Sequence, residues 1–154
     1  MGLKIGDSIP EISIPDETGE LFELNKFTGK QALIVYFYPK NFTPGCVKEA
    51  CDFRDKYEDF KALNAEVIGI SSDSESSHKR FKSKYQLPFI FLSDINKKAR
   101  AAFGVKSALM GLLPGRETFV FDKDGKLIMQ YNNLNAASHT KKALEKLKTL
   151  QDEE

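Results

Sequence analysis

The sequence predicts an α/β fold in which helices flank a mixed central sheet. Three observations support this prediction. Short apolar runs typical of buried strands alternate with segments of helical spacing, a hairpin signal follows them, and an amphipathic helix comes last. The alternation favours a sheet covered by helices and the hairpin adds antiparallel strands, so a mixed sheet is expected.

The first third of the chain is expected to contain a turn, the central strand and a helix. Residues 17–20, ETGE, are typical of a turn. Residues 31–38, QALIVYFY, form an almost unbroken apolar run that Pro39 stops, which indicates a strand buried on both faces. A helix is expected to begin near Pro44, because five side chains after it share one face at helical spacing: Cys46, Ala50, Phe53, Tyr57 and Phe60.

Two further pairs of strand and helix follow. Residues 66–70 predict a strand, and the polar residues 71–74 after it are suited to cap a helix. Residues 89–92 predict a third short strand, followed by a helix over residues 96–103 that Gly104 ends. The order of strand and helix therefore repeats along the chain.

The last third begins with a glycine-rich loop around residues 110–115. The segments TFVF and LIMQY then flank the turn residues 122–125, DKDG, which predicts two antiparallel strands. From about Ser138, apolar side chains recur at helical spacing with lysines on the other face. A final helix is therefore expected to pack one stripe against the sheet.

Length and charge favour one soluble domain over residues 1–154 that binds neither nucleic acid nor membrane. The 154 residues carry a net charge of +1, which gives no broad basic face for nucleic acid. No apolar run reaches the roughly eighteen residues of a membrane span, and the first ten residues do not resemble a secretory signal. We expect a cytoplasmic protein, or an organellar one if a transit peptide has been removed.

Cys46 is the candidate nucleophile. It follows the predicted central strand and lies in the first turn of the predicted helix, where the positive end of the helix dipole favours a thiolate. A free cysteine is most often only a small buried apolar residue. The position of Cys46, the neighbouring Thr43 hydroxyl and the second cysteine, Cys51, favour a reactive thiol instead.

The histidines give no further site. Two cysteines at this spacing with only His78 and His139 elsewhere match no zinc pattern, so neither a metal nor a cofactor is expected. Both histidines lie in lysine-rich helical settings. We interpret them as surface or capping residues.

The pattern around Cys46 resembles that of the peroxiredoxins, in the branch called bacterioferritin comigratory protein or peroxiredoxin Q. The resemblance rests on the pattern Pro39…TPGC, on EAC after it, and on Arg116 ahead of TFVF, and it extends over nearly the whole chain. It implies a single thioredoxin-like domain of the AhpC/TSA type, residues 1–154. Two positions depart from the usual pattern, Asn41 and Val47, and neither removes a catalytic group.

The resemblance also implies the reaction and its residues. Cys46 would attack a hydroperoxide and become a sulfenic acid, and Cys51 would resolve it as a Cys46–Cys51 disulfide. Donors must hold the peroxide and stabilise the leaving oxygen, because deprotonating the thiol alone gives little net gain in rate. The residues suited to this are Pro39 as a shield, Thr43, Gly45 and Arg116 as donors, and Glu49 as the group that orients Arg116.

The same resemblance implies the partners. Hydrogen peroxide and organic hydroperoxides would be the substrates, and thioredoxin or a similar dithiol protein the reductant, in antioxidant defence. The chain is expected to be a monomer, with a weak dimer as the alternative.

Two other functions use the same residues. A thiol–disulfide oxidoreductase would use Cys46 and Cys51 directly, although such enzymes normally have two residues between their cysteines rather than four. A redox-sensing or holdase module on the same fold would not be an enzyme. Peroxide consumption with and without thioredoxin and its reductase distinguishes the three.

Overall fold

The computed structural model describes residues 2–105, 107–108 and 113–152, and its elements alternate as the sequence predicts. In chain order they are β1 (Ser13–Pro15), β2 (Leu21–Glu23), the 3₁₀ helix η1 (Leu24–Phe27), β3 (Ala32–Phe37), α1 (Pro44–Asp55), α2 (Tyr57–Ala62), β4 (Ala65–Ser71), α3 (Glu75–Tyr85), β5 (Ile90–Ser93), α4 (Lys98–Phe103), β6 (Ser107–Ala108), β7 (Leu113–Pro114), β8 (Glu117–Phe121), β9 (Leu127–Asn132) and α5 (Ala136–Asp152).

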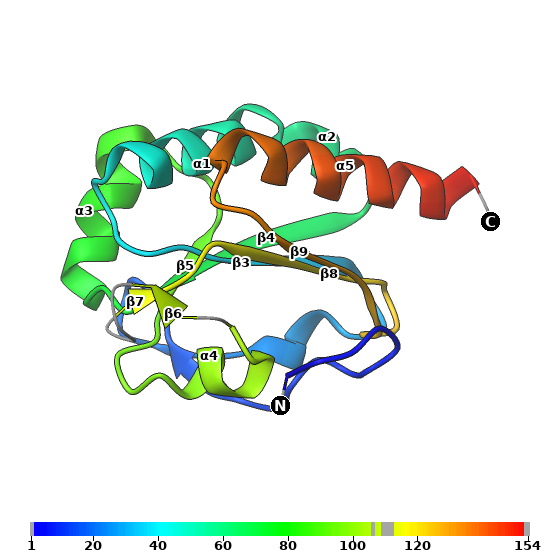
Figure 1. Ribbon diagram of the computed structural model, residues 1–154, viewed down its shortest axis with the longest axis horizontal. Helices are drawn as coiled ribbons and strands as arrows, with labels where there is room; N and C mark the ends of the chain where they lie inside the picture. The colour runs from blue at the N-terminus through cyan, green and yellow to red at the C-terminus, as the bar shows by residue number, and fades with distance from the viewer. Residues whose placement is uncertain (1, 106, 109–112, 153–154) are drawn as a thin grey trace.

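A five-stranded mixed sheet forms the centre of the molecule, in the order β5-β4-β3-β8-β9 (Figure 1). Strands β3, β4 and β5 are parallel, whereas β8 runs antiparallel to β3 and to β9. The last residue of β3, Phe37, pairs with the first residue of β8, Glu117. The segment after β3 and the segment before β8 therefore lie at the same edge of the sheet.

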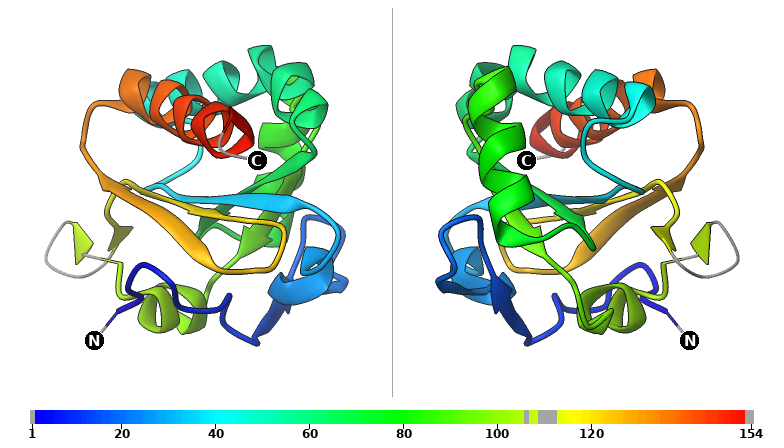
Figure 2. Two further views of the ribbon diagram at one scale, coloured as in Figure 1. Left: turned by 90° about the vertical axis from the view of Figure 1, so that its right-hand side faces the viewer. Right: turned by 90° about the vertical axis from the view of Figure 1, so that its left-hand side faces the viewer.

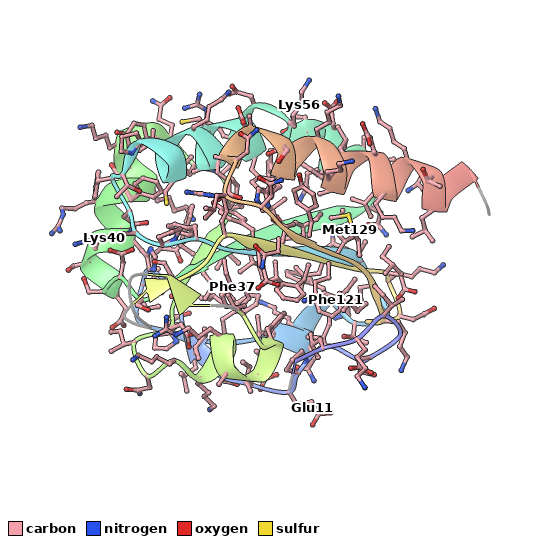
Figure 3. All side chains as sticks on the ribbon, in the orientation of Figure 1. Glu11, Phe37, Lys40, Lys56, Phe121 and Met129 are labelled. Carbon is pink, nitrogen blue, oxygen red and sulfur yellow. The ribbon has the colours of Figure 1, made fainter. Side chains whose placement is uncertain are left out.

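Both faces of the sheet are covered, so β3 is buried on both sides as its composition predicts. Ile34 and Tyr36 belong to the core between the sheet and helices α1, α2, α3 and α5. Phe37 and Phe121 belong to the second core, beneath α4 and the N-terminal segment. Figures 1 and 2 show these two layers, and Figure 3 labels Phe37 and Phe121 on the α4 side.

The region after Cys46 differs from the expected single helix. Helix α1 ends at Asp55 and a separate helix, α2, begins at Tyr57. Phe60 is fully buried as expected, but Tyr57 is only partly buried and its hydroxyl donates to Glu66 on β4. Tyr57 therefore lies at the edge of the predicted apolar stripe and not within it.

The predicted turn at residues 17–20 connects the short strands β1 and β2, for which the sequence gives no clear strand pattern. Gly19 has a φ of +91°, a conformation that favours glycine. The predicted hairpin at 122–125, the helix cap near residue 74 and the helix end at Gly104 are all present. The predicted loop around 110–115 lies partly outside the described residues, which omit 109–112.

In the described part of the chain, no helix has the length and apolarity that crossing a lipid bilayer requires.

Candidate active site

Cys46 lies in the first turn of α1, at the sheet edge where β3 ends. Pro44 occupies the start of the helix, as the sequence predicts, and Thr43 precedes it in extended conformation. The Cys46 side chain is only 1% exposed. The N–H of Val47 is bonded to the Thr43 carbonyl, whereas the N–H groups of Gly45 and Cys46 lie at helix positions that precede the first α-helical bond. The thiol therefore lies beside backbone donors and the positive end of a helix.

Arg116 reaches Cys46 from the other side of the same edge. It immediately precedes β8, whose pairing with β3 brings it near the helix start. Its Nη1 donates to Oε1 of Glu49 over 2.6 Å, and its Nη2 lies 3.5 Å from Sγ of Cys46. Both Arg116 and Glu49 are buried. One guanidinium thus connects a buried carboxyl group to the candidate nucleophile.

Gly45 provides the space for this guanidinium. A Cβ atom added at Gly45 would lie 2.9 Å from Nη2 of Arg116, closer than ordinary contacts allow. Gly45 therefore contributes to the site through its lack of a side chain as well as through its N–H.

Glu49 is surrounded by a second layer of polar groups. Burial raises the pKa of Glu49 to about 8, against the opposing effect of Arg116. Its Oε2 has no hydrogen-bond partner among the described residues and lies 3.6 Å from Nδ1 of His139. Burial also lowers the pKa of His139, which favours a neutral ring. That ring accepts from the Thr118 hydroxyl over 2.7 Å at Nδ1 and donates to the Asn133 carbonyl over 2.6 Å at Nε2.

The expectation that both histidines lie at the surface is wrong. His78 and His139 are each 0% exposed. Their lysine neighbours face solvent, but His139 lies four and eight residues before the buried Ala143 and Leu147, on the apolar stripe of α5. That spacing is the signal that identifies His139 as a buried residue.

The loop between β3 and α1 holds two more of the predicted residues, Thr43 and Pro39. The Thr43 hydroxyl donates to the Lys40 carbonyl over 2.8 Å, which fixes its direction. Pro39 is half-buried at the start of this loop. The structure thus places Pro39, Thr43 and Cys46 on consecutive parts of one segment at one sheet edge.

Cys51 is half-buried on the same helix as Cys46, and both cysteines are free thiols. Ideal helix geometry separates Cα atoms five residues apart by about 8.6 Å. A disulfide requires Cα atoms within about 7 Å, so the two thiols are not placed for bonding while α1 is intact.

The described side chains form no cluster of three or more histidine, cysteine, aspartate or glutamate residues suited to hold a metal ion. The chemistry available at this edge is that of a buried thiol, a guanidinium and backbone N–H groups. This arrangement stabilises negative charge on the sulfur and on an oxygen beside it.

Comparisons with known proteins show what the chain is similar to. A model of the AhpC/TSA family matches residues 5–130. The chloroplastic peroxiredoxin Q of Sedum lineare is 49% identical over 146 residues, which make up 94% of this chain and 78% of that protein. The chain spans 78% of the length of that relative and 58% of the length of the peroxiredoxin Q of Oryza sativa subsp. indica.

Two solved structures share the whole fold. Peroxidoxin BcpB from Mycobacterium tuberculosis superimposes with a TM-score of 0.88 at 35% identity, covering 96% of this chain and 97% of that one. The bacterioferritin comigratory protein of Xanthomonas campestris gives a TM-score of 0.82 at 28% identity, covering 93% and 98%. The work on that second protein concerns its alkyl peroxide reduction activity.

Proposed function

The chain belongs to the AhpC/TSA family, in its peroxiredoxin Q branch, and from this premise we propose that Cys46 carries out a thiol-dependent reduction of hydroperoxides. The family is one of thiol peroxidases with a thioredoxin-like fold, so the protein is an oxidoreductase. The observation that most directly supports the role of Cys46 is the contact of Arg116 with both its sulfur and Glu49.

In the first step the Cys46 thiolate attacks the distal oxygen of the hydroperoxide. An S–O bond forms and the O–O bond breaks, so the sulfur is oxidised by two electrons to a sulfenic acid while the peroxide becomes an alcohol or water after taking up a proton. Arg116 and the N–H groups of Gly45 and Cys46 stabilise the charge that develops on the leaving oxygen. The Thr43 hydroxyl orients the peroxide and Pro39 shields the sulfur from water.

In the second step the Cys51 thiol attacks the sulfenic sulfur, which forms the Cys46–Cys51 disulfide and releases water. The two cysteines lie five residues apart on one helix, so we propose that the first turns of α1 unwind before this bond forms. A dithiol protein of the thioredoxin type then reduces the disulfide, becoming a disulfide itself.

The two other functions considered above have less support. The four-residue spacing between the cysteines and the buried position of Cys46 disfavour a direct disulfide exchange enzyme. A sensor or holdase would not require a buried arginine beside the sulfur. The geometry at Cys46 therefore supports the peroxidase best.

Further parts of this proposal concern substrates, assembly and compartment. The peroxiredoxin family acts on hydroperoxides with thioredoxin-like reductants. We propose that hydrogen peroxide and alkyl hydroperoxides are both substrates, and that residues 1–154 act as one domain, as a monomer or a weak dimer. The peroxiredoxin Q proteins of Sedum lineare and Suaeda salsa are chloroplastic, which favours an organelle over the cytoplasm that we expected.

The test is peroxide consumption by the reduced protein with and without thioredoxin and its reductase. We expect catalytic turnover only with the reductant present. Cys46→Ser is expected to abolish turnover, and Arg116→Ala to slow it by about a hundredfold or more. Unchanged turnover in Cys46→Ser would overturn the proposal.

A further inference from the structure

A buried polar network connects the loop before Cys46 to helix α3. Asn41, in this loop, is 3% exposed, and His78, on α3, is 0% exposed. Asn41 Nδ2 lies 3.0 Å from Nδ1 of His78, and Asn41 Oδ1 accepts a hydrogen bond of 2.6 Å from the Tyr38 hydroxyl. None of these three side chains has a part in the reaction steps above.

The hydrogen-bond partners of Asn41 determine the orientation of its amide group and the tautomer of His78. Because Oδ1 accepts from Tyr38, Nδ2 faces the imidazole and donates to Nδ1 of His78. The ring proton is then on Nε2, which lies 3.5 Å from Oγ of Ser71. Burial lowers the pKa of His78, which agrees with a neutral ring that accepts at Nδ1.

The backbone of the loop is attached to the same region. The N–H of Asn41 donates to Oδ2 of Asp73 over 2.9 Å, and the Ser71 hydroxyl donates to the same oxygen over 2.6 Å. His78 stacks on Phe91 of β5, with 5.7 Å between ring centroids. The loop is therefore held through the main chain of Asn41 by the partly buried Asp73 and through the side chain of Asn41 by the buried His78.

The next residue, Phe42, has a backbone conformation that the surrounding contacts must stabilise. Phe42 has a φ of +66°, which is unfavourable for a residue with a bulky side chain, and its ring packs against Phe81 of α3. Asn41 and Phe42 are the two residues between Lys40 and Thr43. The Thr43 hydroxyl donates to the Lys40 carbonyl across them. Figure 3 labels Lys40 at the outer edge of the molecule, near α3.

We propose that Asn41 and His78 are positioning residues for peroxide reduction. Their hydrogen bond holds the loop so that the Thr43 hydroxyl and Pro39 face the bound peroxide. This inference rests on the proposed function. Cys46 and Arg116 are held separately, by α1 and by Glu49. Loss of the hydrogen bond should therefore slow the reaction with peroxide and leave the reactivity of the thiol itself unchanged.

The experiment compares two variants of similar shape at one position. His78→Asn keeps a hydrogen-bond acceptor near the place of Nδ1, whereas His78→Leu removes it. We expect His78→Leu to slow the first reaction of reduced protein with hydrogen peroxide by roughly tenfold or more and His78→Asn to retain most of the rate. Alkylation of Cys46 by iodoacetamide and reduction of the oxidised protein by thioredoxin are expected to keep the parent rates in both.

Asn41→Ala tests the other end of the hydrogen bond and does not depend on how a buried ring is replaced. We expect at least as large a loss, because Asn41→Ala also removes the hydrogen bonds of Asn41 to Tyr38 and Ser77. The double variant Asn41→Ala with His78→Leu is expected to be no slower than Asn41→Ala, since that variant already lacks the hydrogen bond to His78. The control is Asp122→Ala, which removes side-chain hydrogen bonds from the β8–β9 turn at the opposite edge of the sheet. It should lower thermal stability and leave the peroxide rate unchanged.

Several results would overturn the proposal. These are equal peroxide rates in His78→Leu and His78→Asn, losses that multiply in the double variant, or alkylation that slows as much as peroxide reduction does. A parent protein that consumes no peroxide would instead refute the proposed function, and the positioning role with it. An active parent with equally active variants refutes the positioning role alone.

Discussion

Nη2 of Arg116 occupies the space in which a side chain at Gly45 would begin, because a Cβ atom there would lie 2.9 Å away from it. The guanidinium cannot move aside freely, since its Nη1 is bonded to Glu49 over 2.6 Å. The glycine before Cys46 thus leaves the room in which Nη2 of Arg116 lies 3.5 Å from the sulfur.

Gly45→Ala should therefore impair catalysis without unfolding the protein. Gly45 lies in α1, where alanine is favoured, but the new methyl group displaces Arg116 from Cys46. We expect the single-turnover rate with hydrogen peroxide to fall about tenfold or more while the melting temperature stays close to that of the parent. A parent-like rate would show that Arg116 adjusts without cost.

Two substitutions at Thr43 distinguish the contribution of its hydroxyl group to catalysis from that of its side-chain volume. Thr43→Ser keeps the group that donates to the Lys40 carbonyl, and Thr43→Val removes it at nearly constant volume. We expect a mild effect for serine and a loss of about a hundredfold for valine in peroxide reduction, because valine has no hydroxyl oxygen to accept from the peroxide and orient it. If both variants behave alike in single-turnover assays, the hydroxyl has no role.

The buried Glu49 should make folding stability depend on pH. Burial raises the pKa of Glu49 from 4.5 to about 8, so between these values the folded protein holds a proton that the unfolded chain releases. This contribution to stability is complete at low pH and is lost as the pH rises through that window. Glu49→Gln does not titrate. We therefore expect the melting temperature of the parent, relative to Glu49→Gln, to fall between about pH 5 and about pH 8. A constant difference would show that Glu49 is ionised throughout.

Formation of the Cys46–Cys51 disulfide should unwind the first turns of α1. The two cysteines lie on one helix, where five residues separate Cα atoms by about 8.6 Å, more than a disulfide allows. We expect amide hydrogen exchange across residues 45–55 to become faster after treatment with peroxide, and to stay slow in treated Cys51→Ser. Equal protection in the reduced and disulfide forms would disprove the unwinding step.

The sequence predicts the part of the site that depends on local pattern. A buried strand, a proline at the helix start and a cysteine in the first turn are neighbours along the chain, so the unit from β3 to α1 is readable from residues 31–55. The contact of Arg116 with Cys46 spans 70 residues, and only the resemblance to a known family pointed to it.

Other features depend on contacts between distant segments. His78 and His139 have charged neighbours in sequence, yet the sheet and the facing helices bury both. The break between α1 and α2 lies within an apolar pattern that continues through it. Phe60 is fully buried in the core, whereas Tyr57 packs at its edge and its hydroxyl is bonded to Glu66 of β4.

The most direct test of the central claim, that Cys46 reduces peroxide and Cys51 resolves it, is the intact mass of the reduced protein after one equivalent of hydrogen peroxide. We expect the parent to lose about 2 Da as the disulfide forms, Cys51→Ser to gain about 16 Da as sulfenic acid, and Cys46→Ser to stay unchanged. With excess peroxide, Cys51→Ser is expected to gain about 32 Da as sulfinic acid. A parent protein that consumes the peroxide with both thiols still free would contradict the claim, as would a Cys46→Ser variant that consumes it at the parent rate.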